Sequence, residues 1–444
     1  MNGGGRREPN ARDVAFAVLR DVFGPEARTA QAAFDVRSRR AKLDVRDRAF
    51  AAELAYGSIK QRRLIDWLLA PYIGSRVKAP SPAVADILRL GVYQLRFMSG
   101  VEDHAAILET VNLAWRHGHK GTAGLVNAVL RRMQADGPRE PQVADFQSDA
   151  DYLGTLRSVP TWIARQFLHA LDGMSDAALA AVNAAPRTAL RVNTLRADVA
   201  EVSALLAERG LTAQPSAYVA ESLLLLGGSV ADDDAGRWSL QSESAAIPVD
   251  LLAPQPGEQV LELCSGRGNK TLQIAARLRD QGHIVCIERD ANKMAILSSA
   301  LERSGVANVA PVIGDAQSDA PDVRADAVLL DAPCSGVGVI GRHPEARWRK
   351  LPSDGQRLAV TQAALLRSAA DRTKRGGRLV YSVCSIDPRE GRAVLDAFLT
   401  GDAEFVRAAV PERYAAFMRE GDLIVPPGIE GRDGFYIASL QRSA

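Results

Sequence analysis

The sequence contains few cysteines and no long apolar run. Its four cysteines, among 444 residues, form no CxxC pair and no zinc framework, so we expect free thiols in a reducing compartment. No apolar stretch reaches the roughly 18 residues that a membrane helix needs. The first ten residues, MNGGGRREPN, lack the apolar core of a signal peptide. We therefore expect a cytoplasmic protein with no membrane association.

Length and charge predict several domains, one of them basic. A chain of 444 residues exceeds what one hydrophobic core usually serves, so two or three domains are expected. The net charge is only +2, but residues 1–133 carry 22 Lys and Arg against 13 Asp and Glu, whereas the remainder carries 33 against 40. This asymmetry favours nucleic-acid binding by the first third over the alternative of a solvated, Arg-rich helix surface.

The first third, residues 1–133, is predicted to be an all-α domain. Apolar residues recur there at spacings of three and four, with breaks at PYIGSRVKAPSP and HGHKGTAG and no β-type alternation. Residues 134–151 are polar and acidic, which is typical of a linker. Residues 152–240 are expected to form a helical and small α/β region, in which LRVNTL and SLLLL predict strands and VAEVSALLAERG predicts a helix closed by Gly210.

Residues 241–444 alternate between strand and helix. The runs EQVLELC, HIVCIE, VAPVIG, ADAVLLDA and GRLVYSV are typical of buried parallel strands, and helical stretches lie between them. This rhythm predicts an α/β, Rossmann-like, doubly wound sheet. In such a sheet, ligands bind beyond the carboxyl ends of the strands.

The ends of the first three strands predict a nucleoside-binding edge. The first strand runs into LELCSGRGNKT, where Gly266 and Gly268 let a ligand approach the backbone and the next helix offers free N–H groups. Glu288 ends the second strand, where a carboxylate commonly binds a ribose diol, and Asp315 follows the third, available to an adenine amino group. These features leave NAD open, although the loop lacks GxGxxG and no hydride-transfer site follows it.

Two cysteines follow the fourth and fifth strands. DAPCSG places Asp331 and Cys334 after the fourth strand, and YSVCS places Cys384 after the fifth. We expect these strands to be neighbours, so that a thiol and a carboxylate can act on one ring beside the ligand-binding edge. Cys264 and Cys286 lie in the first two strands, where core packing is expected.

Together these motifs are similar to those of a known family. DAPCSGVG and YSVCS, with LRVNTL, QSESAAIPV, VGVIGRHPEARW and DGFYIASL, resemble the Sun/Nop2 family of RNA 5-methylcytosine methyltransferases. The helical segments DRAFAAELAYGSIKQ and GLVNAVLRR resemble its NusB-like RNA-binding domain, which points to the RsmB branch over nearly the whole chain. The resemblance implies a NusB-like domain over 1–133 and a Rossmann-like methyltransferase domain over 241–444.

The resemblance also implies a reaction and a role for each site residue. The expected substrate is a cytidine of small-subunit (16S) ribosomal RNA, in a loop or single strand, methylated at carbon 5. Cys384 is implied to add to carbon 6, Asp331 to serve N3, and Cys334 to assist product release. No metal is expected. The implied site for S-adenosyl-L-methionine comprises Cys264, Ser265, Gly266, Arg267, Gly268, Asn269, Lys270, Glu288, Asp315 and Asp331.

Three alternatives stay open. The family loop usually reads Pro-Gly-Gly-Lys, whereas SGRGNK has Arg267 and Asn269 in place of the proline and the second glycine, so a NusB-like RNA-binding or assembly factor with impaired catalysis is a rival. The second alternative, closer to the implied function, is a methyltransferase of the same chemistry that acts on transfer RNA. DNA cytosine methyltransferases take their nucleophile from a Pro-Cys pair, which would exchange the roles of Cys334 and Cys384.

Two further groups of residues can be interpreted either as parts of a functional site or as ordinary turn and surface residues. HGH at 117–119 offers two metal ligands without a third, so a turn is favoured over a metal site. Contact with RNA phosphate and a solvated loop are both open for the basic residues Arg342, His343, Arg347 and Arg349.

Overall fold

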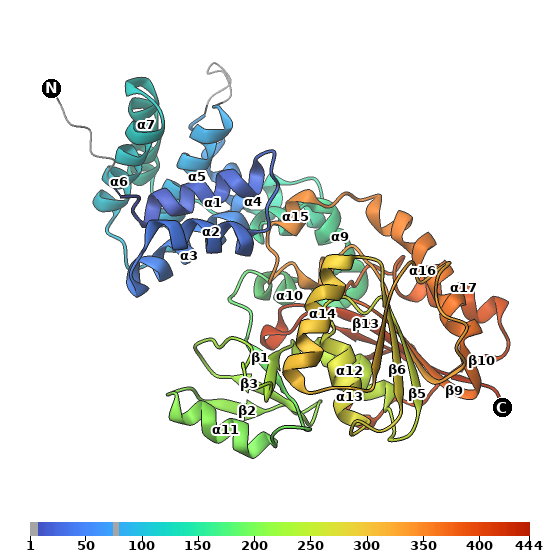
Figure 1. Ribbon diagram of the computed structural model, residues 1–444. Coiled ribbons are helices and arrows are strands. Elements are labelled where there is room, and N and C mark those ends of the chain that lie inside the picture. The colour runs from blue at the N-terminus through green and yellow to red at the C-terminus, as the bar shows by residue number, and fades with distance from the viewer. Residues whose placement is uncertain (1–7, 74–79) are drawn as a thin grey trace. The chain divides into compact units, whose positions relative to one another are not determined.

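The computed structural model describes residues 8–73 and 80–444 (Figure 1). The chain divides into two compact units: one comprises Met1–Leu168 and Arg342–Arg349, and the other comprises His169–Gly341 and Lys350–Ala444. Residues 1–7 of the opening decapeptide and residues 74–79 of the expected break at 71–82 lie outside the described residues. No helix within the described ranges is long and apolar enough to cross a membrane.

The described part of the first unit is built from helices and turns, which confirms the all-α prediction. Side-chain caps start many of the helices; Asn10, for example, accepts hydrogen bonds from the N–H groups of Arg12 and Asp13. Their apolar faces meet in one core, where Leu54 and Leu88 are fully buried. The helices are α1 (Ala11–Phe23), α2 (Ala30–Ala41), α3 (Val45–Lys60), α4 (Arg62–Leu69), α5 (Pro82–Phe97), α6 (Asp103–His117), α7 (Lys120–Asp136), α8 (Asp149–Leu156) and the start of α9 (Thr161–Leu171).

The segment that follows α7 belongs to the helical unit. Arg63 donates hydrogen bonds from its backbone N–H to Ser158 Oγ (3.0 Å) and from its guanidinium to the Val159 carbonyl (2.8 Å) and Thr161 Oγ1 (3.0 Å). Residues 149–168 were predicted to be divided between the linker and the pre-catalytic region, but they pack with the helices before them.

A short segment from the second half of the chain, residues 342–349, also belongs to the helical unit. It includes α15 (Ala346–Arg349). Arg347 is fully buried and donates to the carbonyl of Ser158 at 3.2 Å, and the indole N–H of Trp348 donates to the carbonyl of Ile59 at 2.7 Å. Arg347 therefore holds protein backbone, so for this residue both interpretations from sequence, the RNA contact and the solvated loop, are wrong.

The second unit begins with a small antiparallel sheet of order β2-β3-β1-β4. Leu190 of β1, Val202 of α11 and Trp238 of β4 are buried in its core. The predicted strands at LRVNTL and SLLLL and the predicted helix are present, and Gly210 beyond that helix has a φ of +74°, which favours glycine. The elements are α10 (Ser175–Ala181), β1 (Ala189–Val192), α11 (Val199–Glu208), β2 (Ala213–Pro215), β3 (Ser222–Leu225) and β4 (Trp238–Leu240).

The larger sheet contains the five predicted strands, all parallel, in the order β9-β8-β5-β6-β7. The expectation that β8 and β9 are neighbours is confirmed. Because β5 lies between β8 and β6, the strand order reverses beside the glycine loop, which is where ligands bind in such sheets. The strands are β5 (Gln259–Leu263), β6 (His283–Glu288), β7 (Val309–Ile313), β8 (Ala325–Asp331) and β9 (Thr373–Val383).

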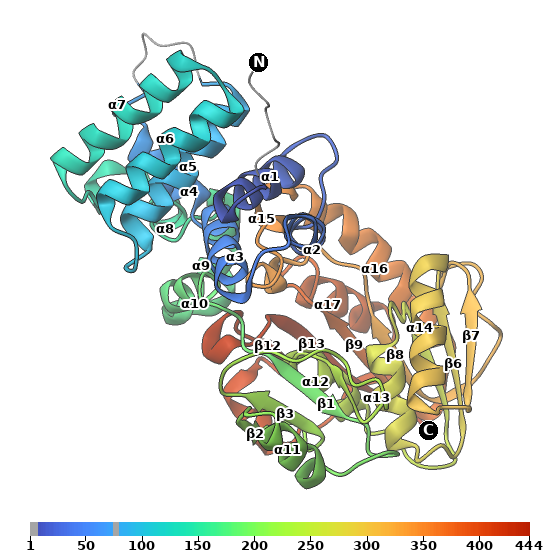
Figure 2. The ribbon, with the colours of Figure 1, turned by 60° about the vertical axis from the view of Figure 1, so that its left-hand side comes forward.

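Helices cover both faces of this sheet (Figure 2). On one face α12 (Glu243–Leu252), α13 (Asn269–Arg277) and α14 (Ala291–Ser304) pack on the strands, and on the other face α16 (Asp354–Asp371) and α17 (Arg392–Gly401) do so. The Rossmann-like prediction is therefore confirmed.

The sheet continues beyond β9 with antiparallel strands that were not predicted. The last six residues of the run DGFYIASL lie in β13 (Phe435–Arg442), which pairs with β9 on one side and β12 (Asp422–Val425) on the other. Two short strands, β10 (Phe405–Arg407) and β11 (Met418–Arg419), complete this part. The sheet is therefore mixed, with a parallel half that carries the strand-end motifs.

Candidate active site

A cavity of about 290 Å³ opens at the carboxyl ends of β5, β6, β7 and β8. It lies at the edge where the sequence predicted a ligand, and both strand-end cysteines reach it. The residues that line it are Cys264, Gly266, Ile287, Glu288, Arg289, Lys293, Gly314, Asp315, Ala316, Gln317, Asp331, Ala332, Pro333, Cys334, Thr361, Leu365 and Cys384.

The glycine loop needs glycine at two positions, and both carry it. Gly266 has a φ of +60°, and Gly268, the residue before α13, has a φ of +87°. A side chain on Gly268 would also meet Leu297, because a Cβ there would lie 2.7 Å from Leu297 Cγ. Arg267 and Asn269 are not among the described residues with positive φ. The departures from the family pattern therefore fall where the backbone does not require glycine.

Glu288 fixes this loop to the second strand. It is 6% exposed, and its carboxylate accepts the backbone N–H of Gly266 and that of Asp290, each at 3.0 Å. Each carboxylate oxygen keeps a further lone pair for a ligand hydroxyl. Asp315, after β7, accepts the N–H of Gln317 at 2.9 Å and also lines the cavity. These two acids lie where ribose and adenine contacts were expected.

Asp331 is held between a lysine and a serine. Lys270 Nζ lies 2.5 Å from Asp331 Oδ2, and the Ser382 hydroxyl donates to Asp331 Oδ1 at 2.8 Å. Burial acts to lower the pKa of Lys270, but the adjacent Asp331 carboxylate outweighs it and the pKa is raised. An ammonium–carboxylate pair therefore stands at the carboxyl end of β8.

The sulfur atoms of Cys334 and Cys384 lie 3.0 Å apart. The hydrogen bond with Cys384, followed by burial, raises the pKa of the Cys334 thiol well above its ordinary value. The two thiols are therefore within hydrogen-bonding distance, and Cys334 holds its proton more tightly than an ordinary thiol does. The predicted convergence of Cys334, Cys384 and Asp331 on one cavity is present.

The other two cysteines differ from each other. Cys286 is fully buried in the core, as expected. Cys264 packs against the core but also lines the cavity, with a φ of +61°. Burial and the acids around it raise the pKa of the Cys264 thiol to about 12, which keeps it protonated and unreactive.

Only some of the residues expected around the cofactor line the cavity. Cys264, Gly266, Glu288, Asp315 and Asp331 do so. The remaining candidates are absent from the lining: Ser265, Arg267, Gly268, Asn269 and Lys270. Lys270 contacts Asp331 instead, and Asn269 Nδ2 donates to the carbonyl of Leu240 at 3.4 Å.

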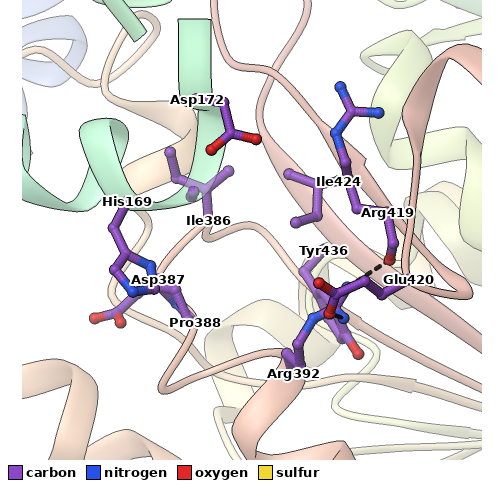
Figure 3. Close-up of a pocket in the computed structure, with 11 residues that line it drawn as sticks. His169, Asp172, Ile386, Asp387, Pro388, Arg392, Arg419, Glu420, Ile424 and Tyr436 are labelled. Carbon is purple, nitrogen blue, oxygen red and sulfur yellow. Dashed lines mark hydrogen bonds and ion pairs between the residues drawn. The ribbon is translucent and has the colours of Figure 1, made fainter. Parts of the chain in front are cut away.

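A second cavity, of about 220 Å³, lies beside the segment that follows Cys384 (Figure 3). His169, Asp387 and Tyr436 line it, and Arg392 makes an ion pair there with Glu420. No cysteine and no predicted site residue contributes to its lining. The two thiols therefore belong to the cavity at the strand ends and not to this one.

No group of three or more His, Cys, Asp or Glu side chains could hold a metal ion within residues 8–73 and 80–444. Of the histidines in the HGH motif, His117 contacts Asp13 at 3.0 Å and His119 caps α7 by accepting the N–H of Gly121.

A Rossmann-like sheet whose carboxyl edge carries this acid-lined cavity is typical of nucleoside-binding proteins, and the family match of this sheet makes the chain an S-adenosylmethionine-dependent methyltransferase. Residues 249–441 match the family model of the 16S rRNA methyltransferases RsmB/F, residues 9–135 match the NusB family, and residues 159–230 match the ferredoxin-like domain of the RsmF/B-like methyltransferases. The chain belongs to the ribosomal RNA small subunit methyltransferase B family.

Individual relatives match over almost the whole chain. The probable ribosomal RNA small subunit methyltransferase B of Bacillus subtilis (strain 168) is 32% identical over 90% of this chain and 92% of its own length. The ribosomal RNA small subunit methyltransferase B of Thermus thermophilus is 33% identical over 98% of both chains. The crystal structure of PH0851 is similar with a TM-score of 0.80 and 26% identity, over 97% of both chains.

Proposed function

We propose that this ribosomal RNA methyltransferase modifies carbon 5 of a cytidine in 16S ribosomal RNA through a covalent adduct with Cys384. The observation that carries this proposal is the pair of thiols 3.0 Å apart beside a lysine-paired carboxylate in the cofactor cavity. Methylation of an amine or a hydroxyl uses a lone pair of the substrate and needs no thiol. Carbon 5 has no lone pair, so a nucleophile must first add to the ring.

The chain's own residues account for each bond change. The Cys384 sulfur, as its thiolate, forms a bond to carbon 6, the C5–C6 π electrons shift to the C4–C5 bond and toward N3, and a proton passed from the Lys270 ammonium through Asp331 neutralises the charge that develops at N3. Bound S-adenosylmethionine supplies the methyl group to carbon 5. The C5 proton then passes to the deprotonated Cys334 sulfur, the C5–C6 double bond forms again, N3 returns its proton to the Lys270–Asp331 pair, and the Cys384 thiolate leaves.

The hydrogen bond between the thiols supports this division of roles. The contact with Cys384 raises the pKa of the Cys334 thiol, and negative charge at Cys384 would interact favourably with the Lys270 ammonium. Once Cys384 is bonded to carbon 6, its sulfur is a thioether that carries neither a proton nor a charge. The largest cause of the raised Cys334 pKa is then removed, so Cys334 becomes more acidic at the step in which it acts.

The cavity fits S-adenosylmethionine through main-chain and carboxylate groups. Glu288 is proposed to accept the ribose hydroxyls, Asp315 the adenine amino group, and Gly266 to allow close approach of the backbone. The rival function, an assembly factor with impaired catalysis, was based on Arg267 and Asn269. Because the two positive-φ positions within SGRGNK, 266 and 268, are both glycine, we favour an active enzyme.

The target cytidine must leave its stack to reach Cys384, so a loop or a single strand is the proposed substrate. To test this function, unmodified 16S ribosomal RNA is incubated with the enzyme and S-adenosylmethionine and then sequenced after bisulfite treatment. We expect one cytidine to resist conversion, and transfer RNA under the same conditions to show none. Methyl incorporation with full conversion of every cytidine would place the methyl group elsewhere and overturn the proposal.

A further inference from the structure

Each of the two cysteines is followed by a serine, and one buried carboxylate binds both serines. Glu390 is 0% exposed. Its Oε1 accepts the backbone N–H of Ser335 at 2.7 Å, and its Oε2 accepts the hydroxyls of Ser335 at 2.5 Å and of Ser385 at 2.7 Å. The two hydroxyls also lie 3.2 Å from each other. One side chain therefore joins the strand end of Cys334 to the strand end of Cys384.

The same carboxylate is tied to the helix behind the cavity. Gln362 of α16 donates from Nε2 to the Pro333 carbonyl at 2.9 Å and to Glu390 Oε1 at 3.3 Å. The Tyr381 hydroxyl donates to the backbone carbonyl of Glu390 at 2.5 Å. Residues before and after both cysteines are thus held by one hydrogen-bonded network.

Glu390 does not line the cavity, so it has no route to a substrate or cofactor. Enclosing a carboxylate is costly, and burial raises the pKa of Glu390 above its ordinary value. A turn that only needed to connect β9 to α17 would place a charged side chain in solvent, as the exposed residues of most turns do. We therefore expect the buried Glu390 carboxylate to have a function that depends on its hydrogen bonds at this position.

We propose that Glu390 is a positioning residue that holds the two cysteine-bearing strand ends together and thereby sets the distance between the Cys334 and Cys384 sulfurs. This inference rests on the catalytic roles proposed above for the thiols, but the distance that Glu390 controls is measurable without any reaction on RNA. Displacement of a reacting group by about 1 Å is enough to reduce a rate by about 100-fold.

The test measures how fast Cys334 and Cys384 form a disulfide in the full-length protein. Oxidised glutathione is the reagent: the two protein thiols are oxidised to one disulfide, and the glutathione disulfide is reduced to two glutathione thiols. Peptide mapping identifies the product. A disulfide requires a sulfur separation of about 2 Å, close to the 3.0 Å present, so the wild-type protein should form it readily.

The variants separate position from charge. Glu390→Gln keeps an oxygen for the Ser335 N–H and can still hydrogen-bond both hydroxyls, so its disulfide rate should stay within about 3-fold of wild type. Glu390→Asp is one methylene shorter and cannot reach both serines, so its rate should fall by about 10-fold. The Glu390 charge also contributes to the raised pKa of Cys334, and its removal alone would speed the reaction. A slower rate in Glu390→Ala therefore reports geometry.

Asp250→Asn is the matched control, because Asp250 is a buried carboxylate bound by Arg277 and Tyr414 and contacts neither cysteine loop. It should lose thermal stability and keep the disulfide rate. If the folded Glu390→Asp and Glu390→Ala proteins form the disulfide as fast as wild type, Glu390 does not set the distance and the inference is overturned. Slower disulfide formation without any cytosine methylation in the wild type would instead overturn the proposed function and leave this inference standing.

Discussion

Lys270 Nζ lies 2.5 Å from Asp331 Oδ2, although 61 positions separate the two residues along the chain. The lysine comes from the loop that was expected to bind the cofactor, and the aspartate from the motif that was expected to act on the base. The pair means that one loop serves two purposes: Gly266 lines the cavity, and Lys270 forms an ion pair with Asp331.

Replacing Lys270 should therefore impair the reaction more than cofactor binding. In Lys270→Met, Asp331 loses the ammonium that stabilises charge near the base, and we expect kcat to fall by about 100-fold or more. The Kd of S-adenosylmethionine, measured by calorimetry, should change little, because Lys270 does not line the cavity. Lys270→Arg keeps the positive charge and serves as the control. If Lys270→Met loses affinity for S-adenosylmethionine and keeps its kcat, Lys270 binds the cofactor and does not act on the base.

Glu288→Ala should weaken S-adenosylmethionine binding. Loss of hydrogen bonds from a carboxylate to the ribose corresponds to about 1.5 to 3 kcal/mol in the free energy of binding. Glu302→Ala, at an exposed position of α14, should bind as wild type does. An unchanged Kd in folded Glu288→Ala would show that Glu288 does not bind S-adenosylmethionine.

The two cysteine variants should differ on a denaturing gel. Cys384→Ala should form no covalent complex with RNA, because the ring is never activated. Cys334→Ala should transfer the methyl group but release product slowly, so that an adduct of protein and RNA accumulates. Both variants are incubated with RNA and S-adenosylmethionine and run side by side. An adduct in the Cys384→Ala lane alone would show that Cys334 is the nucleophile.

The stability of the catalytic unit should decline with rising pH because of Glu262. Burial raises its pKa from 4.5 to about 8, and the Thr271 hydroxyl bonds to its carboxyl at 2.6 Å. A carboxyl whose pKa is higher in the folded state is stabilising below about pH 4.5, and this contribution is lost as pH rises toward 8. Relative to Glu262→Gln, the wild-type free energy of unfolding should fall by about 1.4 kcal/mol per pH unit in that window. Parallel curves for the two proteins in thermal unfolding would contradict the assignment.

The helical unit should contribute to RNA binding through exposed cations. Arg39, Arg40 and Lys42 are exposed where α2 ends. If they neutralise RNA phosphates, the triple alanine variant should reduce the slope of log Kd against log salt by about 0.7 to 0.9 for each phosphate that is no longer neutralised. A slope equal to that of wild type, measured by filter binding, would assign this charge to a solvated surface.

Sequence patterns predicted the parts of the fold whose signals are local. The parallel strands are short apolar runs separated by amphipathic helices, and both patterns can be read without knowing what packs against them. The antiparallel strands β10 to β13 escaped prediction because the pairing of β13 with β9 joins positions such as Leu440 and Leu379 that are far apart in the sequence. The strand DGFYIASL is buried along most of its length, so it shows no alternation that would mark it.

The convergence of Cys334, Cys384 and Asp331 on one cavity was predicted from their positions after neighbouring strands, and their roles from the family resemblance. Glu390 was missed because DPREGR has the composition of a solvated turn, and nothing in those letters indicates that one carboxylate is enclosed by two serines. Arg347 was misread for the same reason. Burial of a charged side chain depends on partners that are distant in sequence, such as the carbonyl of Ser158.

The incorporation of residues 342–349 into the helical unit has a topological consequence. The chain passes from one unit to the other three times, after residues 168, 341 and 349, so after a proteolytic cut before residue 168 the segment 342–349 stays covalently attached to the second unit at both of its ends. A truncated protein that starts at residue 134 would retain Trp348 and Arg347 but lack most of the helices that bury them. The helical unit is thus not a detachable appendage, and gene fragments that separate it from the catalytic sheet would yield two incomplete halves.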